Sequence, residues 1–264
     1  MGLLADNKLI KVLMVCSVWP SNIKLGLVPF LVEQVLSLQK NGIDIEVFVF
    51  YGKGNPVRYV WYWLKFHYKC LFKRYDIIHA QFGQSGIIAL PTLSPLVVTF
   101  HGSDLQGWVG NNGRYSTAGR IMQRISRMIA QHAEEIIVVS EQLIPYLPAS
   151  LPANLIPCGI DLELFRPILQ AEARKQLDLP LDKYLVLFVG DSKNPIKRFS
   201  LARQAFELLK GSIDVRLVVA TDIPHKTMPI YMNACNVLVL TSKHEGSPTV
   251  VKEALACNLP IVST

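Results

Sequence analysis

Several features that define other classes of protein are missing from this sequence of 264 residues. No apolar run reaches the roughly 18 residues that a membrane-spanning helix needs. The nearest stretch, Leu9–Val18, contains Lys11 and is followed by no small-residue cleavage pattern. It therefore predicts a buried strand and not a signal peptide.

Cysteine and histidine are sparse and scattered. None of the five cysteines forms a Cys-x-x-Cys pair, and the six histidines include no His-Glu-x-x-His spacing. This pattern argues against a disulfide framework and against a zinc site. It predicts reduced, mostly buried thiols in a cytoplasmic protein.

A complete dinucleotide-binding fingerprint is also missing. The nearest match, Gly-Lys-Gly-Asn-Pro-Val at Gly52–Val57, lacks a third glycine and follows the second predicted strand, whereas the fingerprint follows a first strand. We predict a plain loop there. The sequence thus disfavours an NAD-dependent enzyme.

What is present is a hydrophobic chain with an excess of positive charge. Half of the residues are hydrophobic and 18% are charged, which supplies enough apolar material for a buried core. The net charge of +7 fits an anionic partner, namely nucleotide phosphates, an anionic membrane surface or a nucleic acid.

Short runs rich in Val, Ile and Phe alternate with segments of helical period, which predicts parallel sheets covered by helices on both faces. The predicted strands are Lys11–Cys16, Asp44–Phe50, Asp76–Ala80, Leu96–Phe100, Glu135–Val139, Leu185–Val189, Val215–Ala220, Val237–Leu240 and Pro260–Ser263. The clearest helical segments are Val28–Lys40, Ala118–His132 and Phe199–Leu209. A connector with three prolines, from Pro157 to Pro180, separates two such series. We predict two Rossmann-like domains, residues 1–166 and residues 167–264.

The segment Ser242–Thr264 carries the strongest chemical signal. We expect Ser247 to cap a helix whose first residue is Pro248. The N–H groups of Thr249 and Val250, together with the positive end of the helix dipole, would then form a phosphate site.

Two carboxylates flank that expected phosphate site. Glu253 lies four residues after Thr249 on the same helix face, where it can reach a group beyond the phosphate, such as a ribose diol. Glu245 precedes the cap, on the other side. Two carboxylates around a cationic cradle suit a nucleotide sugar, but a capped helix with a glutamate is common in α/β proteins and by itself favours a structural role.

Glu245 and Glu253 form an E-x(7)-E motif within Glu-Gly-Ser-Pro-Thr-Val-Val-Lys-Glu-Ala. This motif resembles the donor-site signature of glycosyltransferase family 4, and the likeness continues along the chain. The supporting segments are KVLMVCSVWP, YDIIHA, HGSD, IIVVSE, IPCGIDLELFRP, LFVG and YMNACNVLVL. The E-x(7)-E segment is specific, whereas each strand motif is weak alone.

The resemblance implies an α/β fold of the GT-B type, with two Rossmann-like domains, parallel sheets and an incomplete second domain. It implies retaining transfer of a hexose-type sugar from a UDP- or GDP-linked donor to a hydroxyl of a glycan or lipid-linked acceptor, as in polysaccharide biosynthesis. It implies no metal, no other cofactor and no protein nucleophile, and the chain contains no Asp-x-Asp motif. No nucleic-acid partner is expected.

The resemblance also implies roles for individual residues. His101 and Glu245 would contact the donor sugar, His101 near the anomeric centre or the 6-hydroxyl, and Glu253 would hold the ribose hydroxyls. Gly26 would let the backbone approach the phosphates, and Lys197 would neutralise the diphosphate. The remaining predicted donor-binding residues are Arg198, Ser247, Thr249 and Val250.

The clearest departure from the family is Asp191, which occupies the position of a diphosphate-binding arginine. Lys193 or Arg198 would take over that role. Asp191 also keeps open a catalytically inactive, nucleotide-binding scaffold, and nucleotide-sugar epimerisation or hydrolysis stays open as another GT-B activity. A further choice concerns Asp104, which would either orient His101 or cap the following turn.

Relatives of this family continue for about a hundred residues beyond the point that matches Thr264. We therefore expect a fragment whose second sheet keeps four strands, with the strand of Ile261 and Val262 at an unpaired outer edge. Such a fragment is expected to aggregate and to be inactive alone.

The segment Val60–Arg74 combines aromatic residues with three lysines at four-residue spacing, Lys65, Lys69 and Lys73. An ordinary amphipathic helix packed on the sheet explains this pattern. So does an interfacial helix that touches anionic lipid on the inner face of a membrane. Both alternatives stay open.

Overall fold

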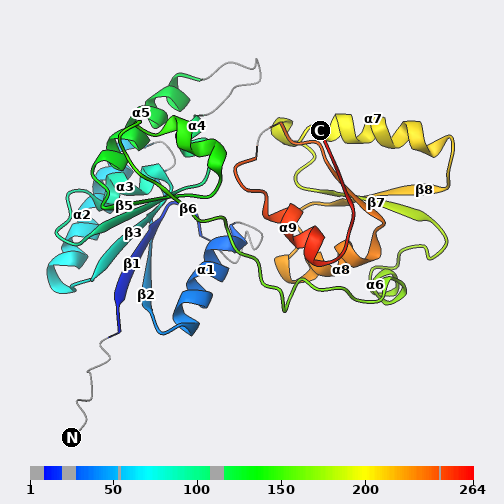
Figure 1. The fold of residues 1–264 in the computed structure, drawn as a ribbon, viewed down its shortest axis with the longest axis horizontal. Coiled ribbons are helices and arrows are strands. Elements are labelled where there is room, and N and C mark those ends of the chain that lie inside the picture. The colour runs from blue at the N-terminus through cyan, green and yellow to red at the C-terminus, as the bar shows by residue number, and fades with distance from the viewer. Residues whose placement is uncertain (1–8, 20–27, 53–54, 108–115, 244) are drawn as a thin grey trace, which may run out of the picture. The chain divides into compact units, whose positions relative to one another are not determined.

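The computed structural model describes residues 9–19, 28–52, 55–107, 116–243 and 245–264. The chain divides into two compact α/β units (Figure 1). Among the described residues, unit 1 takes 9–19 and Leu31–Cys158, and unit 2 takes Gly159–Thr264 together with residues 28–30. The predicted domain boundary between residues 166 and 167 stays a prediction.

Unit 1 is built on a six-stranded sheet in the order β2-β1-β3-β4-β5-β6, and every neighbouring pair is parallel. Its strands are β1 (Lys11–Cys16), β2 (Asp44–Val49), β3 (Ile77–Gln81), β4 (Leu96–Phe100), β5 (Glu135–Val138) and β6 (Asn154–Leu155). Its helices are α1 (Pro29–Lys40), α2 (Pro56–Phe72), α3 (Gly83–Ala89), α4 (Ser103–Gln106) and α5 (Thr117–Gln131), followed by a 3-10 helix at Glu141–Tyr146.

Both faces of the unit 1 sheet are covered, which explains its continuous apolar strands. Alternate residues of β1 point to opposite faces, so Leu13 belongs to the larger core while Met14 belongs to a smaller one. Phe66 of α2 packs in the larger core, and Val35 of α1 packs in the smaller one.

Unit 2 is built on a four-stranded parallel sheet in the order β10-β9-β7-β8. Its strands are β7 (Tyr184–Val189), β8 (Val215–Ala220), β9 (Val237–Leu240) and β10 (Ile261–Ser263). Its helices are α6 (Gln170–Gln176), α7 (Phe199–Lys210), α8 (Met228–Ala234) and α9 (Thr249–Ala256), with 3-10 turns at Pro195–Lys197 and His225–Thr227.

The core of unit 2 also uses both faces of its central strand. Leu185 and Leu187 of β7 pack with Met232 of α8. On β7, Phe188 meets Phe199 of α7 edge-on, with ring centroids 4.9 Å apart. The sheet therefore sits between helices, as an α/β architecture requires.

The α/β fold with two parallel sheets, predicted from the sequence, is confirmed. So is the second sheet of four strands, with β10 at its edge. The loop predicted at Gly52–Val57 is shorter than expected. Asn55 accepts a hydrogen bond from the Val57 N–H at 2.9 Å and caps α2, which begins at Pro56.

Candidate functional site

The carboxyl ends of β7 and β9 carry two predicted site residues of opposite charge. β8 lies on one side of β7 and β9 on the other, so the strand order reverses there. Open parallel sheets bind ligands at such reversals, outside the carboxyl ends of the strands. Lys197, after β7, forms an ion pair with Glu245, after β9, at an Nζ–Oε1 distance of 2.6 Å. The sequence predicted both residues, and the fold brings them together.

Local structure fixes the direction of the Lys197 side chain. Asn194 accepts a hydrogen bond from the Ile196 N–H at 3.0 Å and so begins the 3-10 turn that ends at Lys197. The Lys197 carbonyl accepts a hydrogen bond from the Thr241 hydroxyl at 2.8 Å. Gly190 has a φ of +132°, and a Cβ atom there would lie 3.5 Å from the Lys197 stem. The stem thus extends over a glycine, and its ammonium stays at the end of β7.

Two other charged residues near β7 are engaged by their own surroundings. The Arg198 guanidinium donates hydrogen bonds to the Thr241 carbonyl at 2.5 Å and to the Thr264 hydroxyl at 2.6 Å. Asp191 accepts a hydrogen bond from the Lys193 N–H at 2.8 Å, which closes a turn. Whether Lys193 or Arg198 replaces the arginine of the family stays a prediction, as does a donor-binding role for Arg198.

Helix α9 begins one residue later than the sequence predicts. Its first residue is Thr249, and Pro248 occupies the cap with an extended ψ of 106° and no side-chain hydrogen bond to the helix. The prediction that Ser247 caps the helix is therefore wrong. Instead, the Ser247 hydroxyl accepts a hydrogen bond from Lys252 Nζ at 3.2 Å. Thr249 and Val250 still form the first turn, whose N–H groups have no acceptor within an α-helix.

The Glu253 side chain is buried in unit 2, where its partner is a histidine that the sequence did not suggest. Glu253 Oε1 lies 3.1 Å from Nε2 of His225, and the Glu253 side chain is 7% exposed. The His225 ring in turn packs on Phe165, with centroids 5.1 Å apart. These contacts fix the direction of the Glu253 carboxylate. The sequence gives no signal for the pair, because His225 belongs to no motif.

In unit 1, neutral polar side chains gather at the carboxyl ends of β3 and β4. His101 follows β4, and its Nε2 lies 2.8 Å from Gln81 Oε1 at the end of β3. The Gln81 amide donates a hydrogen bond to Gln34 Oε1 of α1 at 3.0 Å and lies 3.3 Å from His79 Nε2. His79 Nε2 lies 2.8 Å from the Thr99 hydroxyl. This chain of contacts orients the His101 ring, and its only sequence signal is the position of Gln81 after a strand.

Asp104 contacts the backbone around His101 and not its ring. Its buried carboxylate accepts N–H hydrogen bonds from Gly83 at 3.1 Å, from His101 at 3.1 Å and from Gly102 at 2.8 Å. Of the two predicted roles, capping the turn is therefore the one that the contacts support. Asp104 fixes His101 through the backbone alone.

Burial keeps His79 and His101 uncharged at neutral pH. It lowers the pKa of His101 to about 3, with a smaller contribution from His79, and it lowers the pKa of His79 to about 4. A neutral imidazole can exchange hydrogen bonds with a sugar hydroxyl without placing a positive charge beside it. His101 thus suits a contact with an uncharged sugar better than a contact with phosphate.

Most of the predicted site residues lie in unit 2, where the structure brings Lys197 and Glu245 into contact and anchors Glu253. His101 lies in unit 1, within its own polar network. Gly26 lies outside the described residues. The individual roles of all these residues stay predictions.

Two Rossmann-like units with parallel sheets are the architecture of the GT-B class of glycosyltransferases. Solved structures share this fold. A sucrose-phosphate synthase from Thermosynechococcus elongatus matches with a TM-score of 0.72 at 18% identity, over 96% of this chain and 81% of that one. Alr3699/HepE from Anabaena, crystallised with UDP and glucose, matches with a TM-score of 0.60 at 17% identity, over 96% and 80%. At these identities, the likeness concerns the fold alone.

Family models then identify the chain more closely. The model described as Glycosyltransferase Family 4 matches residues 26–164, more than half of the chain. The model described as Glycosyl transferases group 1 matches residues 219–264. The chain belongs to glycosyltransferase family 4, whose members are retaining enzymes that use nucleotide-sugar donors.

Curated relatives differ in how much of their length this chain covers. TuaC of Bacillus subtilis, a glycosyltransferase named for teichuronic acid biosynthesis, is 28% identical over 96% of this chain and 80% of its own length. A D-inositol 3-phosphate glycosyltransferase of Catenulispora acidiphila is 29% identical over 72% of this chain and 56% of its own length. The chain thus spans only about half of the relatives of the second kind.

Proposed function

We propose that this protein transfers a hexose-type sugar from a UDP- or GDP-linked donor to a hydroxyl of a glycan or lipid-linked polysaccharide precursor. The anomeric configuration is retained. The ion pair between Lys197 and Glu245 carries the proposal, because it combines a cation with a hydrogen-bond-accepting carboxylate at the reversal point of the sheet. A nucleotide sugar offers the complement of both, an anionic diphosphate and a ring of hydroxyl groups. The relative named for teichuronic acid biosynthesis supports a polysaccharide acceptor.

The contacts within unit 2 suggest how the donor binds. An ammonium group donates up to three hydrogen bonds, so Lys197 can hold a phosphate oxygen and still contact Glu245. The second oxygen of Glu245 then accepts a hydrogen bond from the donor sugar. The first N–H groups of α9, at Thr249 and Val250, add the positive end of a helix dipole. Glu253, held by His225, accepts hydrogen bonds from the ribose.

Catalysis follows from where charge develops. As the bond between the anomeric carbon and the phosphate oxygen breaks, negative charge moves onto the diphosphate, where Lys197 and the first turn of α9 stabilise it. The departing phosphate oxygen takes the proton of the acceptor hydroxyl, and the acceptor oxygen bonds to the anomeric carbon on the same face. Neutral His101 contacts the sugar near the anomeric centre or the 6-hydroxyl. No protein nucleophile takes part.

A donor screen tests the proposal. The full-length gene product is incubated with UDP- and GDP-linked hexoses labelled in the sugar, and products are analysed by NMR. We expect one donor to be consumed, with the label in a new glycosidic bond of retained configuration. Release of free sugar, epimerised donor or an inverted linkage would each overturn the assignment.

Asp191 favours a second candidate, an inactive scaffold that binds nucleotides. It presents a carboxylate at the position where the family has an arginine, and it closes a turn with the Lys193 N–H. Such a scaffold would bind nucleotide in calorimetry but consume no sugar nucleotide. Turnover by the full-length gene product therefore separates the two candidates.

We also expect residues 1–264 by themselves to aggregate and to be inactive. β10 pairs only with β9 among the described strands, and Val262 on it is 61% exposed. Edge strands with exposed apolar side chains promote association. Clear sugar transfer by a monodisperse preparation of residues 1–264 would show this expectation to be wrong.

A further inference from the structure

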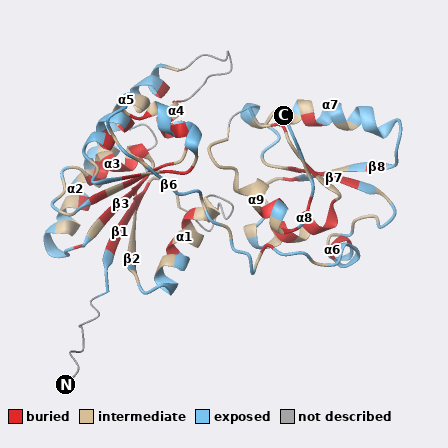
Figure 2. Cartoon of the chain, viewed as in Figure 1, coloured by how far each residue is buried: buried red, intermediate tan, exposed pale blue. Residues whose placement is uncertain are grey.

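Helix α2 has many exposed residues (Figure 2). Apolar side chains form a continuous stripe along its exposed side, which we term the α2 outer face. Its members are Val57, Trp61, Leu64, Tyr68, Leu71 and Phe72, each between 50% and 79% exposed. They follow one another at alternating spacings of four and three residues, with Phe72 beside the last, so they lie on one side of the helix. Monomeric proteins rarely expose a contiguous apolar stripe of this length, and such patches mark interaction sites.

The opposite side of α2 is fixed on unit 1, so the outer face cannot turn inward. Phe66 is 1% exposed and packs in the larger core. The Trp63 indole N–H donates a hydrogen bond to the Leu90 carbonyl at 2.7 Å. Tyr59 meets Phe50 edge-on, with ring centroids 5.6 Å apart. Some aromatic residues of α2 thus pack on the sheet, as an ordinary amphipathic helix requires, while others face solvent. Contact with lipid stays a prediction.

A row of cations borders the outer face. Arg58, Lys65 and Lys69 follow at helical spacing, and α2 contains no acidic residue. Lys65 lies over the ring of Trp61, with its Nζ 5.2 Å from the centroid. Positive charge and apolar surface thus adjoin along the helix.

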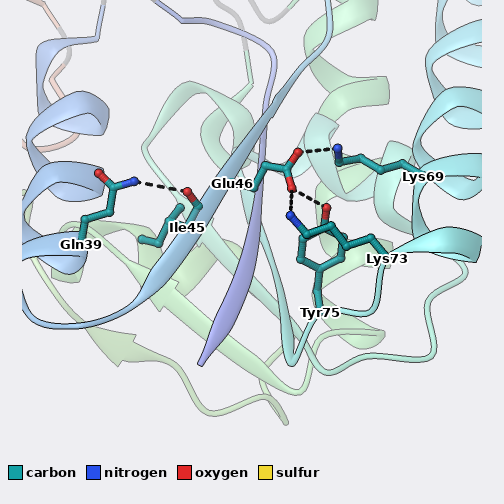
Figure 3. Close-up of polar contacts among 6 residues, drawn as sticks. All are labelled: Gln39, Ile45, Glu46, Lys69, Lys73 and Tyr75. Atoms are coloured by element: carbon teal, nitrogen blue, oxygen red, sulfur yellow. Dashed lines mark hydrogen bonds and ion pairs between the residues drawn. The ribbon is translucent and has the colours of Figure 1, made fainter. Parts of the chain in front are cut away.

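Glu46 of β2 neutralises part of this charge and ties α2 to the sheet (Figure 3). It forms ion pairs with Lys69 and with Lys73, the latter at 2.7 Å, and accepts a hydrogen bond from the Tyr75 hydroxyl at 2.7 Å. Burial alone would raise the pKa of Glu46, but hydrogen bonds from these three partners outweigh burial and lower the pKa to about 2. Glu46 and, through space, Asp44 offset the charges of Lys69 and Lys73. Arg58 and Lys65 leave α2 with an excess of positive charge.

We propose that the α2 outer face binds the surface of an anionic lipid bilayer, with α2 lying in the plane of the interface. A bilayer offers an apolar layer beneath a continuous anionic one, which matches an apolar stripe bordered by cations. Aromatic side chains such as Trp61 and Tyr68 settle at this depth, where an apolar ring and a polar tip are both satisfied. Among the described helices, none has the length and apolar content to cross a bilayer.

Vesicle binding tests this proposal. The full-length gene product is floated with vesicles of phosphatidylcholine, with and without phosphatidylglycerol, at low and high salt. We expect binding that requires phosphatidylglycerol and weakens with salt. Leu64→Ser should weaken it roughly tenfold through lost apolar burial, and Lys65→Glu by roughly fivefold or more through lost attraction to the headgroups. Lipids with brominated tails should quench Trp61 fluorescence, which the Trp61→Phe variant identifies.

Matched controls come from helix α7. Leu208 is 81% exposed there, so Leu208→Ser removes a similar exposed leucine, and Lys210→Glu reverses a charge on a helix of unit 2. Both variants should bind vesicles as the unchanged chain does, and thermal melts should show that all variants are folded. Equal losses in the α7 controls, or vesicle binding unchanged in Leu64→Ser, would overturn the proposal.

A second copy of this chain is the competing partner for the α2 outer face. If light scattering shows a dimer that Leu64→Ser disperses, while vesicles bind neither protein, the face is a contact between copies and the lipid proposal fails. Nucleotide affinity measured on the same variants should stay unchanged, since α2 contributes nothing to the donor site. If the lipid-binding proposal fails, the proposed sugar-transfer activity is therefore not affected.

Discussion

Each unit buries a charged side chain among backbone groups, but the two charges differ in sign and in place. In unit 1, Asp104 is 5% exposed and accepts backbone N–H groups after β3 and β4. In unit 2, Arg174 is 4% exposed and donates to the Ala234 carbonyl at 2.9 Å and the Leu181 carbonyl at 2.8 Å. Backbone dipoles satisfy both charges, as buried charges require.

Their places relative to the strands separate the two charges functionally. Asp104 lies at the carboxyl ends of β3 and β4, next to His101. Arg174 also bonds Asn236, which precedes β9 and accepts the N–H of Leu185 near the start of β7. It therefore braces the amino ends of the unit 2 strands, away from Lys197 and the proposed donor site. One buried charge thus lies in a candidate site, while the contacts of the other lie at the opposite ends of the strands.

The largest expected effect is on the free energy of unfolding, and it tests whether the two buried charges differ in function. Asp104→Ala and Arg174→Ala should each lower the free energy of unfolding by about 3–5 kcal/mol, because each leaves buried polar groups without partners. In the folded fraction, Arg174→Ala should keep its kcat/KM while Asp104→Ala loses activity. Urea unfolding together with kinetics below the transition measures both quantities. Equal kinetic losses would contradict the division between a site charge and a fold charge.

The next effect concerns nucleotide affinity in unit 2. Glu253→Ala should weaken nucleotide binding by about 1.5–3 kcal/mol, the value of a hydrogen bond to a charged group. His225→Ala should weaken it less, because Glu253 remains but loses its orientation. Calorimetry with the bare nucleotide on the full-length gene product measures both, with His132→Ala in unit 1 as a control. Unchanged affinity in Glu253→Ala would remove that residue from the donor site.

Lys197→Ala should lower kcat/KM at least tenfold, about 1.4 kcal/mol, because the leaving diphosphate loses a fixed positive charge. Glu245→Ala should reduce turnover of the sugar nucleotide more than binding of the bare nucleotide. Lys183→Ala, which changes a lysine just before β7 begins, is the matched control and should remain near the unchanged activity. If Lys193→Ala is instead the crippled variant, the diphosphate contact belongs to Lys193.

How far the sequence predicts this molecule depends on whether a signal is local. β1, β4, β8 and β9 match their predicted bounds. For β1 and β4 the reason is that strands buried on both faces are continuous apolar runs. The two-residue strand β6 was not predicted, since so short a segment has no periodicity. The pairing of Lys197 with Glu245 spans 48 positions, and only the parallel topology of an α/β fold brings such residues together.

His225 marks the limit of prediction from sequence. It reaches Glu253 across 28 positions from a 3-10 turn that no pattern predicts. The Ser247 cap failed for a local reason, because Pro248 keeps an extended ψ and takes the cap position itself.

The next prediction is that acid lowers the stability of unit 1 through two of its histidines. The pKa values of His79 and His101 in the folded chain, about 4 and about 3, lie below the ordinary value of 6.5. Their contribution to stability is therefore complete above pH 6.5 and is lost as the pH falls toward those values. We expect moderate acid to destabilise unit 1, and His79→Gln to flatten that dependence. Unfolding curves between pH 7 and pH 5, followed by tryptophan fluorescence, provide the measurement; an unchanged slope in His79→Gln would contradict it.

The smallest effect compares helix caps in the two units. Ser247→Ala should change the free energy of unfolding by less than about 0.5 kcal/mol, because Ser247 does not cap α9. Asn55→Ala should cost about 1 kcal/mol, because the Asn55 side chain caps α2. Thermal or urea unfolding of both variants decides it. A larger loss in Ser247→Ala would restore the cap that the sequence suggested.

Gly190 has a consequence for how this chain tolerates random change. Its φ of +132° is a conformation that side chains with a Cβ rarely adopt, and the Lys197 stem lies directly above it. In a library that samples every amino acid at every position, residue 190 should accept almost nothing but glycine under selection for sugar transfer. Under selection for folding alone the same position should be more permissive. Comparing the amino acids that residue 190 accepts under the two selections would show whether glycine is needed to place Lys197 or to form the turn.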